Sequence, residues 1–268
     1  MRPLIAVLLV ALASPAQVES LELDRLAPEE ITLLESALRT LEPRIVEARQ
    51  QGTANLLTWQ ELLEALPEQE RSFVERFRAL KAEGLGSTSH YFGEVAAADL
   101  VPVGPQAVTK PEGSSVLDPQ YLPQDVRNAY EAMMAVMERD LGRRLLVESG
   151  YRSPAYQLYL FLFYLPKHDY SIRETNRHVA LPGYSEHGYP PRQAIDFINQ
   201  DGINGEDRPE EFEALPEYRW LLQYAERYGF SLSYPRDNPY HTAFEPWHWH
   251  YERHTPRRPE SAPSAAVP

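Results

Sequence analysis

The order of predicted strands and helices is the feature that most constrains the fold of this chain. Three segments have the β-branched and aromatic content of short strands: LLVES (145–149), SLSY (231–234) and WHWHYE (247–252). Helical spacing of apolar residues is predicted over three further segments, 125–141, 154–165 and 220–230. Because these strands and helices do not alternate regularly, the order favours an α+β domain.

A helical segment is predicted ahead of this domain, over residues 21–85. Apolar residues recur there at three- and four-residue steps: Leu26, Leu33, Leu34, Leu38, Leu41 and Ile45. Helix starts are predicted at Pro28, at Thr58 with Glu61 as a capping box, and at Pro67. The segment either packs on the rest of the chain or binds a partner. We favour packing, because amphipathic spacing reports burial alone.

Residues 1–16 have the pattern of a secretory signal peptide. Arg2 is followed by an apolar run from Leu4 to Leu12, and Ser14 and Ala16 are small residues at the spacing of a signal-peptidase site. An uncleaved membrane anchor is the alternative, but the run is shorter than the ~20 residues of a spanning helix. We therefore expect cleavage after Ala16, a mature protein without a membrane span, and a periplasmic or secreted location.

Two stretches have the composition of irregular structure. Glycine and proline recur over residues 86–122, which we expect to form a linker or a wrapping loop. Residues 255–268, TPRRPESAPSAAVP, are predicted to be a disordered tail. The predicted domain is therefore confined to residues 123–254.

Charge and cysteine content exclude several classes of function. The formal net charge is -13, so a basic surface that follows phosphates is not expected, and we expect no nucleic-acid partner. The chain has no cysteine, which excludes disulfides, thiolate nucleophiles and cysteine-ligated zinc. Any strong metal site must use histidine, aspartate or glutamate.

Two segments place histidine near carboxylate side chains. In PGYSEHGYPPRQAIDF (182–197), His187 precedes Asp196 by nine residues, and the turn formers between them allow both side chains to face one point. In EPWHWHYE (245–252), Glu245 lies three residues before His248, and an extended chain places His248 and His250 on one face. There is an alternative for each segment. In the first, the histidine and the aspartate are near each other by chance, and in the second, a buried strand carries two incidental imidazoles.

A third segment, SGYRSPAYQ (149–157), places Arg152 on a tight turn after a predicted strand. Its guanidinium can hold a carboxylate or a developing oxyanion through two hydrogen bonds. A structural salt bridge is the commoner role of a single arginine, so this segment by itself assigns no function.

Taken together, these segments resemble a known family. SGYRS, PGYSEH followed by AIDF, WLLQYAERYGFSLSYP and EPWHW occur in the order typical of the peptidase M15 group that contains VanY-type D-alanyl-D-alanine carboxypeptidases. The resemblance covers residues 123–254. It implies a small antiparallel sheet flanked by helices, with zinc in a cleft on the sheet.

The resemblance also implies roles for eight residues: His187, Asp196 and His248 as ligands of Zn2+, Glu245 as the catalytic base, Arg152 as a substrate contact, and Ser185, Gln157 and His250 as supporting or substrate-binding residues. For His250, a position with no role is the alternative. Three protein ligands leave a fourth position on zinc for water, whose pKa then falls from about 15.7 toward ~7. Glu245 is close enough in sequence to a ligand to take a proton from that water.

The chain departs from the family pattern between two of the implied ligands. In that pattern seven residues separate histidine from aspartate, with a glycine just before the Ala-x-Asp; here the separation is nine, and Arg192 takes the glycine's place. A longer loop can bulge outward without moving His187 or Asp196. Residues 189–192 are then expected at the rim of the cleft, where they would affect substrate preference.

The resemblance predicts a monomeric zinc-dependent D,D-carboxypeptidase that hydrolyses the D-Ala-D-Ala end of peptidoglycan stem peptides. D,D-dipeptidase, endopeptidase and L,D-carboxypeptidase activities stay open, because they use the same metal chemistry. A catalytically inactive cell-wall binding module and an acidic secreted scaffold organised by the N-terminal helices are alternatives from other classes.

Overall fold

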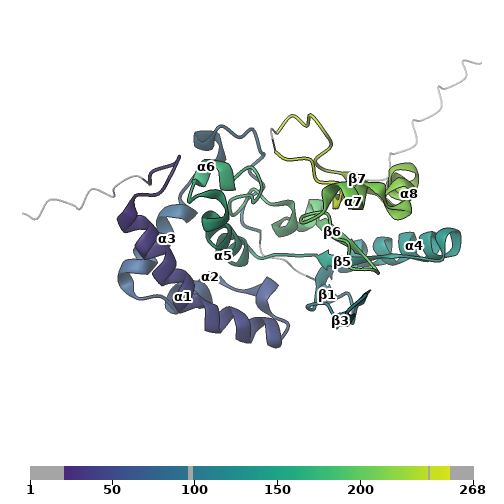
Figure 1. Ribbon diagram of the computed structural model, residues 1–268, viewed down its shortest axis with the longest axis horizontal. Helices are drawn as coiled ribbons and strands as arrows, with labels where there is room; N and C mark the ends of the chain where they lie inside the picture. Colours follow the sequence, from purple (N-terminus) through teal and green to yellow (C-terminus); the bar gives the residue numbers. More distant parts are fainter. Residues whose placement is uncertain (1–20, 96–98, 241, 254–268) are drawn as a thin grey trace, which may run out of the picture.

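The computed structural model describes residues 21–95, 99–240 and 242–253. The predicted signal peptide (1–16) and the predicted tail (255–268) lie outside the described residues. A four-stranded antiparallel sheet has the strand order β5–β6–β8–β7, formed by Leu145–Ser149, Ala194–Asn199, His248–Tyr251 and Phe230–Leu232 respectively. Helices flank the sheet, which confirms the predicted α+β class (Figure 1).

One face of the sheet is apolar. Side chains alternate between the two faces along a strand, and those on this face enter a buried core: Leu145, Val147, Ile195, Phe197, Phe230 and Trp249. Three helices cover them: α4 (Gln124–Leu141), α7 (Pro209–Ala214) and α8 (Pro216–Tyr224). The methionines of α4 are fully buried here, so they serve packing.

The opposite face of the sheet is polar near its centre. Asp196 on β6 and His248 and His250 on β8 alternate with the core residues, so they share this second face. The histidine-and-tryptophan alternation predicted for residues 247–252 is therefore present, with Trp249 on the apolar side.

The N-terminal helices form a second core with α5 (Pro154–Tyr164). They are α1 (Pro28–Gln50), α2 (Trp59–Glu64) and α3 (Glu68–Arg78), and the predicted capping box joins Thr58 and Glu61 at the start of α2. Leu34, Leu41 and Phe77 pack in one cluster with Phe161 of α5. Figure 1 shows these purple and blue helices beside α5, as the packing interpretation predicted.

A polar contact also joins the N-terminal segment to the start of α5. Ser153, the N-cap residue of α5, donates its backbone N–H to the carbonyl of Asn55 at 2.8 Å and its hydroxyl to the carbonyl of Leu57 at 2.6 Å. Its hydroxyl also accepts the N–H of Tyr156. The segment therefore fixes the backbone directly after Arg152.

Residues 86–122, expected to be a linker or wrapping loop, contain short strands. β1 (Leu100–Pro102) pairs with β4 (Tyr121–Pro123), and β2 (Ala107–Lys110) pairs with β3 (Gly113–Val116). Frequent glycine and proline shorten these strands, and for this reason the sequence pattern did not reveal them. Residues before β1 cross the loop that holds His187: Phe92 donates its N–H to the carbonyl of Gly183 at 2.8 Å and stacks on Tyr189.

The remaining helices are short: α6 (Ile172–Thr175) and the 3-10 turns η1 (Ala54–Leu56), η2 (Ala82–Leu85), η3 (Leu165–His168), η4 (Glu186–Gly188), η5 (Pro190–Arg192) and η6 (Ala225–Tyr228). The helix predicted over 220–230 is thus α8 continued by η6, and Gly229 ends it with φ 85°. Within the described ranges, none of the helices combines the length and apolar character needed to cross a membrane.

Candidate metal centre

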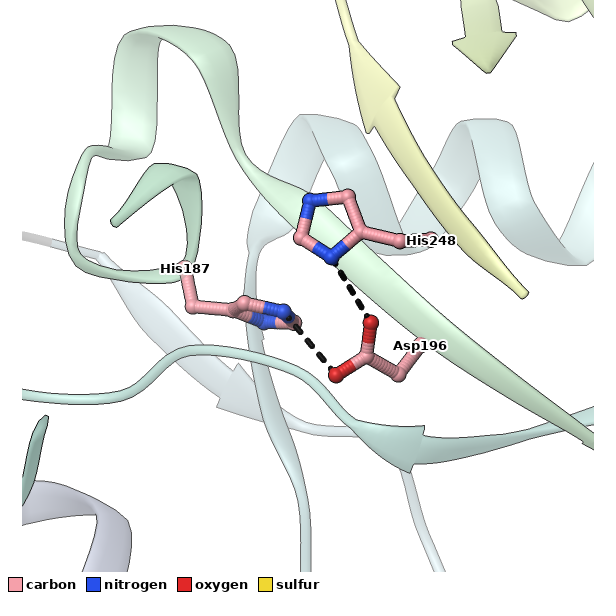
Figure 2. A group of neighbouring side chains, drawn as sticks. All are labelled: His187, Asp196 and His248. Atoms are coloured by element: carbon pink, nitrogen blue, oxygen red, sulfur yellow. Dashed lines mark ion pairs between the residues drawn. The ribbon is translucent and has the colours of Figure 1, made fainter. Parts of the chain in front are cut away.

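Strand pairing brings Asp196 and His248 together. The two residues are directly opposite each other in the antiparallel β6–β8 ladder, so their side chains lie on the same face. Nδ1 of His248 is 2.9 Å from Oδ1 of Asp196. This pair forms the part of the site built on regular structure (Figure 2).

His187 reaches the same point from the turn η4. Its Nδ1 donates to the carbonyl of Gly150 at 2.7 Å, because a carbonyl can only accept, and its Nε2 then lies 3.0 Å from Oδ2 of Asp196. Its own carbonyl accepts the N–H of Arg152 at 3.0 Å. Gly150 is required here, since a Cβ would stand 2.4 Å from the carbonyl oxygen of Tyr121.

The longer loop between His187 and Asp196 does not separate them. It turns through η5, whose Pro190 is buried, and returns to β6 at Ala194. The side chain of Arg192 forms an ion pair with Glu186 at 2.7 Å. Arg192 is thus anchored inside the loop, and Tyr189 is stacked on Phe92.

The geometry of these three side chains fits a metal ion. One ligand atom from each of His187, Asp196 and His248 lies within 4.8 Å of the other two. Among the described residues, Nε2 of His187 and Oδ1 of Asp196 are buried and make no hydrogen bond of good geometry, although each faces another member of the group at 3.0 Å or less. A metal ion between them would satisfy both atoms. Two imidazole nitrogens and one carboxylate are a donor set that suits zinc with one open position.

The electrostatics of the site favour a cation. Burial opposes protonation of His248, but the Asp196 and Glu186 carboxylates outweigh burial and raise the pKa of His248 to about 10. Burial, together with the charge of Arg152, lowers the pKa of His187 to about 4, so this imidazole is neutral at pH 7. A metal ion that binds here must therefore displace a proton from His248 and finds His187 ready as a ligand.

Glu245 is held beside His248 by a tight turn. The N–H of His248 donates to the carbonyl of Glu245 at 3.2 Å, with Pro246 at the second position, where proline favours such a turn. Oε2 of Glu245 is 3.6 Å from Nδ1 of His248. The Glu245 side chain is 12% exposed, and burial raises its pKa to about 8.

Arg152 borders the same site. Its guanidinium lies 3.4 Å from Oδ2 of Asp196, and its side chain is 17% exposed. Among the described residues, Arg152 is the arginine whose guanidinium contacts the group of three side chains, through Asp196. The structure therefore brings together His187, Asp196, His248, Glu245 and Arg152, five of the eight residues named from the sequence.

The other three residues lie around this group. Gln157 is buried and donates its amide to the carbonyl of Ala180 at 2.7 Å. Ser185 is buried, and its carbonyl accepts the N–H of Gly188. His250 is 3% exposed and contacts Ser233 at 2.7 Å, so it lies inside the protein instead of at a rim.

Glu186 is a site residue that the sequence interpretation missed. Its side chain is 5% exposed, and its Oε2 accepts the Nε2–H of His248 at 3.1 Å. The available signal was an acidic residue directly before a proposed ligand, in a turn rich in glycine. Glu186 was overlooked because a glutamate next to a histidine in sequence usually faces solvent.

Glu148, another carboxyl group on the polar face, has a raised pKa. Glu148 on β5 accepts the amide of Asn204 at 3.0 Å, and burial raises its pKa from 4.5 to about 7. The charge of Asp196 acts in the same direction. Because the folded-state pKa is raised, the stability that protonated Glu148 contributes is complete below about pH 4.5 and is lost as pH rises through about 7.

Glu148→Gln is therefore expected to remove this pH-dependent loss. In metal-free protein at pH 8, the variant should exceed wild type in free energy of unfolding by on the order of 1–3 kcal/mol, and the two should converge near pH 4.5. Urea denaturation at both pH values measures the difference. Glu211→Gln, at an exposed ion pair, is the control. An equal difference at both pH values would contradict the expectation.

The chain is similar to known carboxypeptidases over about half of its length. The chain matches a family model described as VanY, D-alanyl-D-alanine carboxypeptidase, over residues 119–254, just over half of its length. It is 29% identical over 137 residues to the carboxypeptidase-type protein YodJ of Bacillus subtilis (strain 168), covering 49% of this chain and 46% of YodJ. The chain thus spans less than half the length of that curated relative.

Two solved structures are similar to part of this chain. The LdcB LD-carboxypeptidase is 26% identical, with a TM-score of 0.45, over 59% of this chain and 69% of that one. The vancomycin resistance D,D-pentapeptidase VanY, solved as a mutant with Zn(II), is 21% identical, with a TM-score of 0.41, over 56% of this chain and 79% of that one.

Proposed function

Because the chain belongs to the VanY family of D-alanyl-D-alanine carboxypeptidases, we propose that it is a zinc-dependent D,D-carboxypeptidase that hydrolyses the D-Ala-D-Ala end of peptidoglycan stem peptides. The observation that carries the zinc proposal is the convergence of His187, Asp196 and His248 from three separate segments, with ligand atoms within 4.8 Å. The activity of the whole protein and its substrate are part of the proposal.

A bound metal would supply two effects. Zn2+ bound by His187 Nε2, Asp196 and His248 Nδ1 would lower the pKa of water and polarise the carbonyl of the scissile amide. The role of the protein is to hold these donors in place and to supply the groups that move protons and bind charge.

Glu245 is the proposed general base. Its carboxylate accepts a proton from the attacking water and returns it to the nitrogen of the leaving D-alanine, so the group ends the cycle in its starting state. The turn that joins Glu245 to His248 keeps this carboxylate beside a proposed ligand atom, and 12% of the side chain is exposed.

Arg152 is the proposed substrate contact. A guanidinium at the edge of the site can pair with the terminal carboxylate of the peptide through two hydrogen bonds, or stabilise charge on the carbonyl oxygen. Its bond to Asp196 is long, at 3.4 Å, so Arg152 can exchange this contact for the substrate. Ser185, Gln157 and His250 are proposed to support the site through packing and hydrogen bonds.

The proposed location is the periplasm or the exterior of the cell, where stem peptides are found. The secretory pattern of residues 1–16 supports it. The acidic net charge disfavours nucleic acid as a partner, and we propose that the protein acts as a monomer.

Incubation of the purified protein with a synthetic stem pentapeptide tests the proposal. We expect release of one D-alanine, detected by mass, and loss of this activity after treatment with a chelator and its return with zinc. Release of the D-Ala-D-Ala dipeptide, or trimming of the tetrapeptide alone, would replace the D,D-carboxypeptidase proposal by one of the related peptidases. Binding of peptidoglycan without hydrolysis and without zinc would indicate an inactive binding module.

A further inference from the structure

A buried carboxylate stands directly behind the proposed metal ligand His248. Oε2 of Glu186 accepts the Nε2–H of His248 at 3.1 Å and the hydroxyl of Ser233 at 2.5 Å. Its Oε1 accepts the Nε–H of Arg192 at 2.7 Å. With 5% of its side chain exposed, Glu186 is held from three sides and has one orientation in the structure.

The partners of Glu186 are themselves linked. Ser233 lies 2.7 Å from Nδ1 of His250, and Nε2 of His250 lies 3.3 Å from Glu252. Glu252 forms an ion pair with Arg192, which returns to Glu186. These five polar side chains form a closed ring, which we call the Glu186 ring. It joins the turn η4, the loop after it and strand β8.

We propose that Glu186 is a positioning residue that orients His248 toward the metal, and that the Glu186 ring holds it there. The inference rests on the proposed function, in which His248 is a zinc ligand. Glu186 itself does not touch the metal position: its contact is with Nε2, on the far side of the imidazole from Nδ1.

In each imidazole, the acceptor bonded to one ring nitrogen decides which nitrogen can bind a metal. A carboxylate can only accept, so Nε2 of His248 carries the proton of the bond to Glu186. The proton that a metal would displace is then the one on Nδ1, which faces Asp196. His187 has the opposite arrangement, because the Gly150 carbonyl takes its Nδ1–H and leaves Nε2 for the metal. Each imidazole therefore has its own acceptor, and such partners fix the ring orientation of metal-bound histidine.

The ring also gives a role to the departure from the family pattern. Arg192 stands where the pattern has glycine, and its guanidinium bridges Glu186 and Glu252. The longer loop is thereby tied to the carboxylate that orients His248. His250 is a member of this ring, so its place in the structure is explained without a contact to substrate.

Zinc affinity of the metal-free protein is the direct test. Glu186→Ala is expected to raise the zinc dissociation constant ~10–100-fold, measured by competition with a chromophoric chelator. Ser233→Ala breaks one link of the Glu186 ring but keeps the acceptor for His248, so it is expected to raise the zinc dissociation constant by less than Glu186→Ala does. The exposed Glu211→Gln is the charge-matched control. With cobalt in place of zinc, Glu186→Ala should also shift the visible absorption bands, which report ligand geometry.

A second measurement uses the wild-type protein and does not depend on how the variant folds. Nitrogen-15 spectra of the zinc-loaded protein should show His248 with its proton on Nε2 and the metal on Nδ1, and His187 with the reverse. The reverse pattern at His248 would overturn the inference, as would zinc binding by Glu186→Ala equal to that of wild type. Failure of wild type to bind zinc would instead overturn the proposed function, and this inference with it.

Discussion

Glu245→Gln is expected to lower kcat for release of D-alanine by ~10²–10⁴-fold, the usual contribution of a general base, while one zinc per chain stays bound. Glutamine keeps the size of the side chain and the tight turn with His248, but it cannot take a proton from water. Glu245 lies 3.6 Å from Nδ1 of His248, so the change removes the base without removing a ligand atom proposed for the metal.

Two assays separate the base from the metal site in this experiment. Stem-peptide turnover gives kcat, and elemental analysis of the same sample after gel filtration gives the zinc content. Glu211→Gln, at an exposed ion pair on α7, should match wild type in both assays. If Glu245→Gln retained full turnover, the proposed base would be wrong, and if it lost zinc, Glu245 would be a ligand.

Asp196→Asn should abolish zinc binding at stoichiometric metal and, with it, hydrolysis. Asp196 supplies the only negative charge in the proposed ligand set and contacts both imidazoles, at 3.0 Å and 2.9 Å. An amide keeps the shape but offers one neutral oxygen, so we expect the zinc dissociation constant to rise by more than ~100-fold, beyond the range for groups that only orient a ligand.

Chelator competition measures this loss, and turnover at excess zinc shows whether activity returns. Asp125→Asn, at an exposed ion pair with Arg253, is the matched control and should bind zinc as wild type does. Near-normal zinc affinity in Asp196→Asn would remove Asp196 from the ligand set and leave two histidines, too few for a stable zinc site of this type.

Local patterns were sufficient to predict most helices and three of the four strands of the central sheet, β5, β7 and β8, whereas β6 was not predicted. The predicted strand over 145–149 coincides with β5, and the predicted helix over 125–141 differs from α4 by one residue at its start. Both segments combine clear apolar spacing with a breaker, Gly142 after α4 and Gly150 after β5. The strands β1 to β4 were not predicted, because segments of three or four residues between prolines have no period to detect.

The candidate site was less accessible to local reasoning. Asp196 and His248 meet because β6 and β8 pair in one register, and no property of either segment alone specifies that register. The grouping came from the resemblance to a family. The proposed role of Glu186 could not be found in either way, since its partners Ser233 and His248 are 47 and 62 residues further along the chain and belong to other elements.

The N-terminal helices, which lie ahead of residue 119, help to position Arg152. The half of the chain that matches the family begins after these helices. Even so, Ser153, which directly follows Arg152 and caps α5, is hydrogen-bonded to the carbonyls of Asn55 and Leu57 in the N-terminal segment. Substitutions in these helices can therefore affect the proposed catalytic site, although the helices supply none of its residues. A substitution that disrupts the packing of Phe77 in the shared cluster is therefore expected to weaken the proposed contact of Arg152 with substrate.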